Sequence, residues 1–110
     1  MSKMSRNKGQ RGERELAKEL SDRGFEARRG RQFSGSPESP DVVCHMLPFH
    51  IEVKRTETLS VYKAMQQAID DSEEEQIPLV CHRRNNKEWL AILKLDDLLD
   101  LVSQIIAPQK

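Results

Sequence analysis

Residues 40–54 limit the possible fold more than any other part of the chain. Within this stretch, apolar and polar residues alternate in the order Phe49, His50, Ile51, Glu52, Val53, Lys54. Alternation with a period of two is typical of a strand whose successive side chains point to opposite faces. One face of the strand is therefore apolar, and the other carries an imidazole, a carboxylate and an ammonium group.

Asp41 begins the apolar segment that precedes this strand. A tight turn around residues 47–48 would pair the two segments as a hairpin and bring Asp41 close to Glu52 and Lys54. Carboxylate oxygens are the ligands that Mg²⁺ and Mn²⁺ prefer, and such an ion can activate water against a phosphodiester. The pattern predicts a divalent-metal site, with a surface ion pair between Glu52 and Lys54 as the alternative explanation.

The rest of the chain predicts eight elements in the order α-β-β-β-α-β-β-α. Helices are expected over about 10–23, 60–72 and 96–106, and strands over about 25–33, 41–46, 49–56, 78–84 and 87–94. Arg84-Asn85-Asn86 predicts a hairpin turn between the last two strands. A central mixed five-stranded sheet flanked by helices would bury the apolar stripes of these elements. We therefore expect one α/β domain over residues 9–110, preceded by a flexible basic arm over residues 1–8.

The charges of the chain are unevenly distributed. Residues 1–35 hold ten Lys/Arg against five Asp/Glu, and residues 36–110 hold eight against thirteen, so the net charge is zero. The basic half suggests a surface for a phosphate backbone. Neither a membrane-spanning run nor a secretion signal is present, so a cytoplasmic protein with reduced cysteines is expected. Zinc held by the Cys44-His45 and Cys81-His82 pairs is disfavoured, since adjacent strand residues point to opposite faces.

One acid of the first predicted helix lies on an unexpected face. Glu13 precedes Leu16, Ala17 and Leu20 by three, four and seven residues, so it shares their inward-facing side. Glu15 and Glu19 point elsewhere and are read as ordinary surface residues. An acid near the positive end of a helix is the alternative explanation for Glu13.

Asp41 followed by Glu52-Val53-Lys54 resembles the active-site signature of the PD-(D/E)XK nuclease superfamily. The helix opened by residues 9–16 and closed at 23–25, with Gly35-Ser36 shortly before Asp41, is similar to the archaeal-type Holliday-junction resolvases. That branch also includes virus-encoded proteins. The similarity covers residues 8–94 and implies a restriction-endonuclease-like fold.

The resemblance assigns roles to individual residues. It implies that Mg²⁺, with Mn²⁺ able to substitute, is held by Asp41, Glu52, the carbonyl of Val53 and Glu13. Lys54 would orient the attacking water or stabilise charge on the phosphate. Ser36 would lie near the scissile phosphate, although Ser34 and Ser39 compete with it. Gln66 would lie near the water, with Gln67 as the alternative. We assign no catalytic task to His50.

The resemblance also implies branched DNA as substrate, a homodimer and a role in DNA recombination. Candidate phosphate contacts are Arg11, Arg28, Arg29, Arg31 and Arg55, with Lys3, Arg6 and Lys8. A dimer would present two active sites to a symmetric junction, in the cytoplasm of a cell or, for a virus-encoded protein, of its host. Two alternatives stay open: a general or nicking DNA-processing nuclease of the same fold, and a catalytically idle DNA-binding module.

Overall fold

The computed structural model describes residues 3–30 and 40–107, and of residues 3–8 it describes the backbone alone. Three helices accompany the sheet: α1 (Lys3–Asp22), α2 (Val61–Asp71) and α3 (Leu95–Ile106). The five strands are β1 (Arg28–Arg29), β2 (Val42–Val43), β3 (Phe49–Arg55), β4 (Ile77–Arg83) and β5 (Leu90–Ile92). The predicted element order and the α/β fold class are confirmed.

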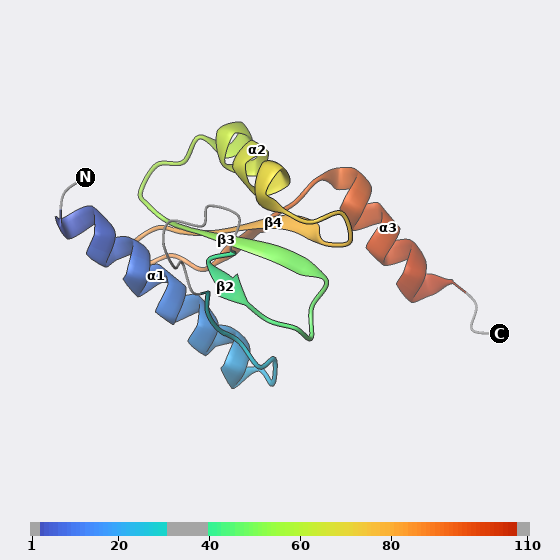
Figure 1. The fold of residues 1–110 in the computed structure, drawn as a ribbon, viewed down its shortest axis with the longest axis horizontal. Coiled ribbons are helices and arrows are strands. Elements are labelled where there is room, and N and C mark those ends of the chain that lie inside the picture. Colours follow the sequence, from blue (N-terminus) through green and yellow to red (C-terminus); the bar gives the residue numbers. More distant parts are fainter. Residues whose placement is uncertain (1–2, 31–39, 108–110) are drawn as a thin grey trace.

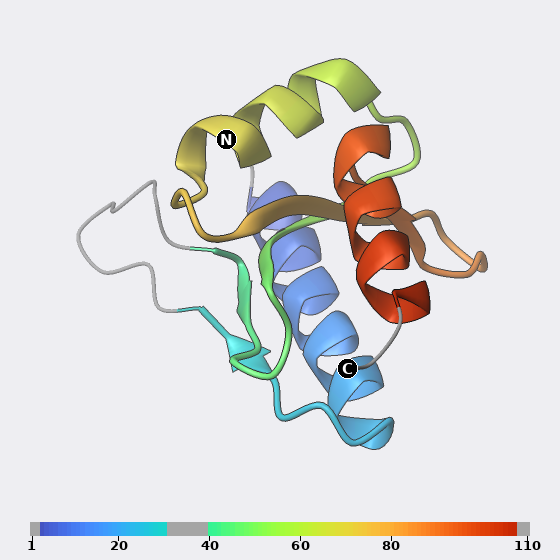
Figure 2. The ribbon, with the colours of Figure 1, turned by 90° about the vertical axis from the view of Figure 1, so that its right-hand side faces the viewer.

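The strands form one mixed sheet in the order β1-β2-β3-β4-β5. The central pair, β3 and β4, is parallel, with Val53 opposite Cys81, and the other neighbours are antiparallel. Parallel strands need a crossover connection, and here α2 provides it between β3 and β4. Figures 1 and 2 show α1 and α2 on opposite faces of this sheet.

Each face of the sheet has its own hydrophobic core. Ile51 and Val53 of β3 pack with Leu16 and Ala17 beneath α1. On the other face Val80 packs with the buried Ala64, Met65 and Ala68 of α2. Because successive strand residues alternate between faces, His50, Glu52 and Lys54 lie on the α2 side of β3. The alternation read from the sequence therefore separates an apolar face of β3, packed under α1, from a polar face on the α2 side.

Helix α1 lies close to the sheet because a glycine stands at the contact. A Cβ at Gly12 would lie 2.6 Å from Cβ of Arg55 and 3.3 Å from Cγ1 of Val53. Only a residue without a side chain fits so near a strand. The predicted start of this helix near residue 10 is wrong, since α1 begins at Lys3. The flexibility of residues 1–8 stays a prediction.

Most strands are shorter than the sequence suggested. β1 and β2 contain two residues each, where nine and six were expected. The predicted turn between β4 and β5 is confirmed, with Asn86 in the left-handed region at φ 59°, which asparagine adopts more readily than most residues. No helix in the described part of the chain is both long and apolar enough to cross a membrane.

The two cysteines belong to the packed interior. Cys44 and Cys81 are both free and buried in the core beneath α1. Burial raises the pKa of Cys81 to about 12, so its thiol stays protonated at neutral pH. His82, next to Cys81, faces away from that core and its Nε2 lies 2.9 Å from the carbonyl oxygen of Thr56. The two Cys-His pairs therefore do not converge.

Candidate active site

Asp41 is tied to β3 by two hydrogen bonds. Its backbone N–H donates to the carbonyl of Ile51 at 2.9 Å, and its Oδ2 accepts the N–H of Val53 at 2.8 Å. The antiparallel register of Val42 with Ile51 sets Asp41 beside Glu52. The strand pairing thus brings together the two acids that the sequence separates by ten residues.

Glu52 is a buried carboxylate in the middle of β3, with 2% of its surface exposed. Its Oε1 lies 3.0 Å from Nε2 of His50, which is also buried. Burial raises the pKa of Glu52 to about 7, and the negative charge of Asp41 adds to this rise while His50 opposes it. The carboxyl group is therefore held where its ionised form is costly.

His50 is the partner that limits this cost. Burial disfavours its charged form, but the hydrogen bond and charge of Glu52 outweigh burial and raise the pKa of His50. The sequence reading gave His50 no task, although a residue two positions before Glu52 shares its strand face. That period-two relation was the signal that could have identified this contact.

Glu13 reaches the same region from α1. Its Oε1 accepts a hydrogen bond from Nε of Arg29 at 3.1 Å, and 17% of its side chain is exposed. Burial is the largest cause of the raised pKa of Glu13, and the negative charge of Asp41 also raises it. The hydrogen bond and positive charge of Arg29 lower this pKa by a smaller amount. The predicted inward orientation of Glu13 is confirmed by this half-buried position.

Lys54 lies on the same strand face as Glu52, and α2 supplies its partner. Its Nζ donates to Oε1 of Gln67 at 3.0 Å. Gln66, the residue preferred from the sequence, instead donates through Nε2 to Oδ1 of Asp70 at 2.8 Å. Neighbouring helix residues are about 100° apart around the axis, so only one of them faces Lys54. The glutamine beside Lys54 is Gln67, which corrects the preference for Gln66.

The acids are neighbours without forming a ready ligand cluster. Within residues 3–30 and 40–107, no three His, Cys, Asp or Glu side chains are grouped to hold one ion. Glu13 is turned toward Arg29, and Glu52 toward His50. The oxygen donors nevertheless suit a hard cation such as Mg²⁺. Burial is the main cause of the raised pKa values of Glu13 and Glu52, and the negative charge of Asp41 adds to both.

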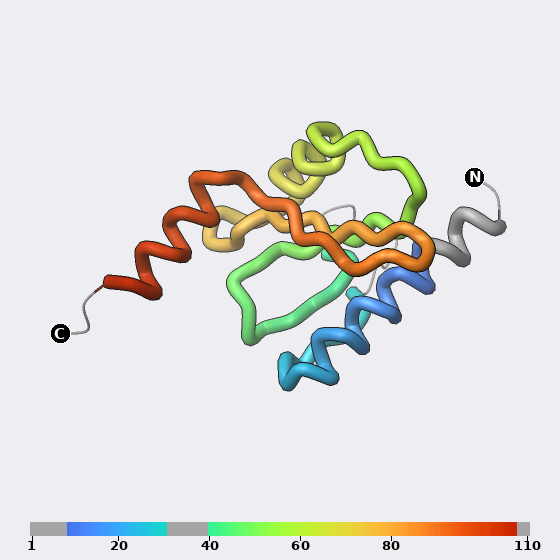
Figure 3. Tube along the Cα trace, turned by 180° about the vertical axis from the view of Figure 1, so that it is seen from behind, coloured from blue at the N-terminus to red at the C-terminus, as the bar shows by residue number. Residues whose placement is uncertain are grey.

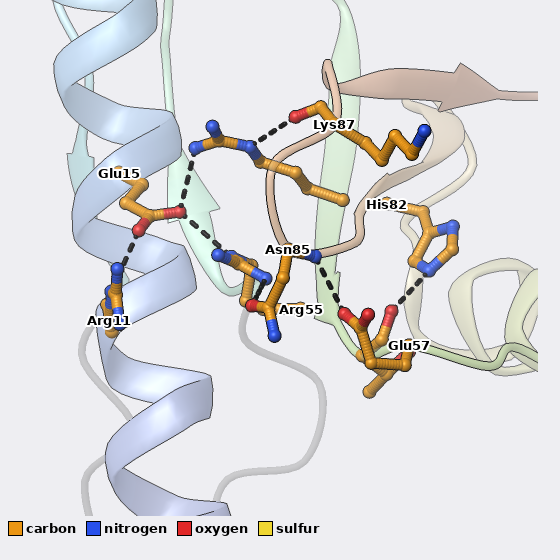
Figure 4. Close-up of polar contacts among 9 residues, drawn as sticks. Arg11, Glu15, Arg55, Glu57, His82, Asn85 and Lys87 are labelled. Atoms are coloured by element: carbon orange, nitrogen blue, oxygen red, sulfur yellow. Dashed lines mark hydrogen bonds and ion pairs between the residues drawn. The ribbon is translucent and has the colours of Figure 1, made fainter.

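Arg55 belongs to a different site, because it lies on the face of β3 opposite Lys54. Figure 4 shows Arg55 with Glu15 and Asn85. Its Nε donates to Oε1 of Glu15 at 3.0 Å and its Nη1 to Oδ1 of Asn85 at 2.9 Å. Only 4% of the Arg55 side chain is exposed. This position leaves no surface for a phosphate, so we remove Arg55 from the candidate DNA contacts.

Glu15 is the centre of that second site, although the sequence suggested an ordinary surface acid. Besides Arg55, it accepts hydrogen bonds from Arg11 at 3.0 Å and Arg83 at 3.2 Å. Burial raises the pKa of Glu15, but the hydrogen bonds from Arg55 and Arg11 outweigh it and lower the pKa overall. Helical spacing could have indicated Arg11, four residues before Glu15, but no periodicity reveals Arg55 and Arg83, which come from β3 and β4.

The remaining candidate residues are four arginines proposed to contact DNA and the serines proposed near the scissile phosphate. Arg28 is exposed on β1, and 67% of the Arg11 side chain is exposed despite its contact with Glu15. The side chain of Arg29 is 39% exposed beside Glu13. Ser36, its competitors Ser34 and Ser39, and Arg31 lie outside the described residues. Of the three described arginines, Arg29 lies beside an acid of the candidate site, whereas Arg11 contacts Glu15 in the other cluster.

Comparisons with known proteins agree with this arrangement. A family model described as "Phage putative PDDEXK endonuclease" matches residues 4–108. A solved structure of Archaeoglobus fulgidus Hjc, a Holliday junction resolvase from an archaeal hyperthermophile, is similar with a TM-score of 0.58 and 28% sequence identity. That match covers 78% of this chain and 72% of the other. A search of curated proteins found no match.

The family match spans the whole described fold, including the strand that carries Glu52 and Lys54 and the segment that carries Asp41. The recognised superfamily and the resolvase-like fold are therefore confirmed. The chain belongs to the phage PDDEXK endonuclease family.

Proposed function

We propose that this endonuclease-family chain is a metal-dependent enzyme that hydrolyses phosphodiester bonds in branched DNA as a homodimer. The observation that carries the proposal is the strand pairing that sets Asp41 beside Glu52, with Lys54 on the same face of β3 as Glu52. Two neighbouring carboxylates create a site that a divalent cation would stabilise. Lys54 adds a positive charge on the same strand face, where a phosphate would be attacked.

The residues that would hold Mg²⁺ are Asp41, Glu52, Glu13 and the carbonyl of Val53. Mn²⁺ would fit the same oxygen donors. When bound, such an ion neutralises phosphate charge and lowers the pKa of water. His50 fixes the Glu52 carboxylate through Oε1, which limits the rotation of this ligand. Glu13 would exchange Arg29 for the cation, and Arg29 would then be free to meet a phosphate.

Lys54 and Gln67 would position the attacking water and the reacting phosphate. The amide oxygen of Gln67 holds the Lys54 ammonium at 3.0 Å, which fixes the end of a flexible side chain. A fixed ammonium stabilises charge in the transition state better than a mobile one, because no reorganisation is needed during the reaction. Ser36 remains the proposed serine near the scissile phosphate.

Branched DNA is proposed from the similarity to the archaeal resolvase and from how the cations are placed. Arg11, Arg28 and Arg29, with Arg31, would contact the phosphate backbone, which positions DNA without reading sequence. The described part of the chain has no helix or ribbon set apart for a DNA groove, so DNA shape is the feature left to recognise. A two-fold dimer would cut two strands of a junction symmetrically.

The test is cleavage of a labelled four-way junction, a fork and a linear duplex in Mg²⁺. We expect junction cleavage well above duplex cleavage, and a loss of about 100-fold or more in Asp41→Asn and Lys54→Ala. Asp22→Asn is the matched control, because Asp22 is an exposed acid paired only with Lys18 at the end of α1. Equal rates on all three substrates would favour the general nuclease, and no cleavage by the wild type would favour the idle module.

The two glutamines give a second test of the same site. Gln67→Ala should lower the cleavage rate by about tenfold, since Lys54 loses the group that orients it. Gln66→Ala removes only a surface contact with Asp70 and should leave the rate unchanged. Equal rates in both variants would show that Gln67 has no part in the reaction.

A further inference from the structure

Helix α3 leaves its apolar side uncovered. None of its residues is buried, and the exposed set comprises Leu95, Leu98, Leu99, Val102, Ile105 and Ile106. These positions are separated by three, four and seven residues, so they form a single stripe along the helix. Figures 1 and 3 show α3 extending beyond the sheet instead of packing across it. We refer to these six residues as the α3 stripe.

A stripe of this kind needs a partner. A helix of 12 residues is only marginally stable by itself in water, and most helices are stabilised by packing of their apolar face. The exposure of Ile105 is 77% and that of Ile106 is 74%, which is unusual for residues of this size. A contiguous apolar surface of this extent marks an interaction site.

The charges of α3 restrict what that partner is. Asp96, Asp97 and Asp100 are its charged residues, and no Lys or Arg occurs between Leu95 and Ile106. A DNA backbone and an anionic lipid surface would both be repelled by this helix. The partner is therefore a protein surface that offers apolar groups with cations near its edge.

Such a surface exists on the same protein. A groove of about 600 Å³ lies between α1 and the β4–β5 hairpin, and no residue of α3 lines it. Its lining is largely apolar and includes Leu16, Leu20, Phe49, Leu79 and Trp89. Arg23, Arg83 and Lys87 also line it, with Glu88 and with Glu19, which pairs with Arg23 at 3.1 Å. We refer to this feature as the α1–β5 groove.

Pairing of α3 with α3 of a second copy is the less favourable arrangement. A helix of 12 residues is about 18 Å long and about 10 Å wide. A contact of that size uses one apolar surface of each copy and leaves both grooves uncovered. It would also place acidic helices side by side, with no cation on either. Docking of each α3 in the groove of the other copy doubles the contact and brings acids toward cations.

We propose that two copies associate reciprocally, with the α3 stripe of each copy docked in the α1–β5 groove of the other. This arrangement covers both exposed apolar surfaces and closes under a two-fold axis. The inference rests on the dimer included in the proposed function and identifies the surfaces that form it. It does not depend on the metal site, which lies on the other face of β3.

The experiment compares sedimentation of the full chain with two kinds of variant. Ile105→Glu places a charge in the stripe, and Ala91→Glu places one at the groove, because Ala91 is exposed, lines the groove and lies opposite Cys81 on that face of the sheet. Each variant should raise the dimer dissociation constant by about 100-fold, because a charge is buried in an apolar contact. Gln104→Glu is the control on the polar side of α3 and should leave the dimer intact. All three positions are exposed within one copy, so folding is preserved, which circular dichroism checks.

Mixing the two monomeric variants gives the decisive result. An equimolar mixture of Ile105→Glu and Ala91→Glu can form a heterodimer with one intact stripe and one intact groove, so association should be partly regained. A wild type that stays monomeric at micromolar concentrations would overturn the proposal, and would indicate α3 folding onto its own chain. An Ala91→Glu variant that remains a dimer would overturn it in favour of paired α3 helices.

The outcome can be separated from that of the nuclease test. A monomeric wild type that still cleaves DNA would contradict the interface and leave the chemistry standing. A reciprocal dimer without cleavage in Mg²⁺ would contradict the chemistry and leave the interface standing. Sedimentation and cleavage on the same preparations therefore give independent answers.

Discussion

Two neighbouring residues of β3, Lys54 and Arg55, have the same charge and opposite surroundings. Lys54 is partly exposed beside Gln67, on the side of the acids, whereas Arg55 is buried against Glu15 under α1. The sequence predicted the acids and Lys54 because hairpin pairing and strand alternation are local rules. It gave Arg55 a DNA contact because charge alone does not tell which cation will be enclosed by a distant helix.

This difference predicts separate effects for two arginines. Arg55→Ala should destabilise the fold by about 3 kcal/mol, since Glu15 stays partly buried after losing one of its partners. Arg28→Ala should leave the unfolding free energy unchanged. It should also lower the slope of log K for DNA binding against log salt concentration by the amount expected for about one phosphate contact. Urea unfolding and binding at several salt concentrations measure both. A folded Arg55→Ala protein of normal stability with weakened DNA binding would return Arg55 to the DNA contacts.

At the level of elements, helix α1 contributes Glu13 to the acid site and Glu15 to the second ion-pair cluster. Its apolar residues Leu16 and Ala17 were predictable from helical spacing, and so was the direction of Glu13. The close approach of its axis to β3 was not, because a glycine within a helical pattern gives no sign of what it faces. Helix α3 is a similar case. Its apolar stripe can be read from the sequence, but only the fold shows that no other element packs against this stripe.

The two glycines of α1 form a matched pair for testing this contact. Gly12→Ala should lower the free energy of unfolding by about 1–3 kcal/mol, because its Cβ would overlap Cβ of Arg55. Gly9→Ala has no atom within 4 Å of its Cβ and should raise stability by up to about 1 kcal/mol through helix propensity. Chemical unfolding of both variants measures the difference. Equal effects at the two positions would mean that α1 lies farther from β3.

Across the whole molecule, the topology followed from the sequence more closely than the lengths did. The order of elements, the mixed sheet and the turn at Asn86 were all predicted from alternation, helical spacing and turn residues. Strand ends were not, because hydrogen bonding to a neighbour decides where β1 and β2 stop. The pairing of charges across elements was also beyond sequence patterns, as Glu15 with Arg83 and Glu13 with Arg29 show.

The burial of Glu52 predicts how the stability of the whole molecule changes with pH. Burial raises the pKa of Glu52 from 4.5 to about 7, so the contribution of this group to stability is present below pH 4.5 and is lost as the pH rises through about 7. Without metal, stability should therefore fall between about pH 4.5 and 7, by up to about 3 kcal/mol. Glu52→Gln should flatten this dependence, and Mg²⁺ should raise the melting temperature of the wild type at pH 8. A wild-type profile as flat as that of Glu52→Gln would contradict the assignment.

The ion pairs around Glu15 limit how helix α1 could be exchanged between related proteins. Glu13 and Glu15 are two positions apart on α1. Contacts that hold Glu15 in place therefore also fix how far the Glu13 carboxylate extends toward Asp41. Arg55 and Arg83 provide these contacts from β3 and β4. A chimaera that takes its amino-terminal helix from a relative would need arginines at both of these positions. Without them, the acid at position 13 would be displaced from Asp41.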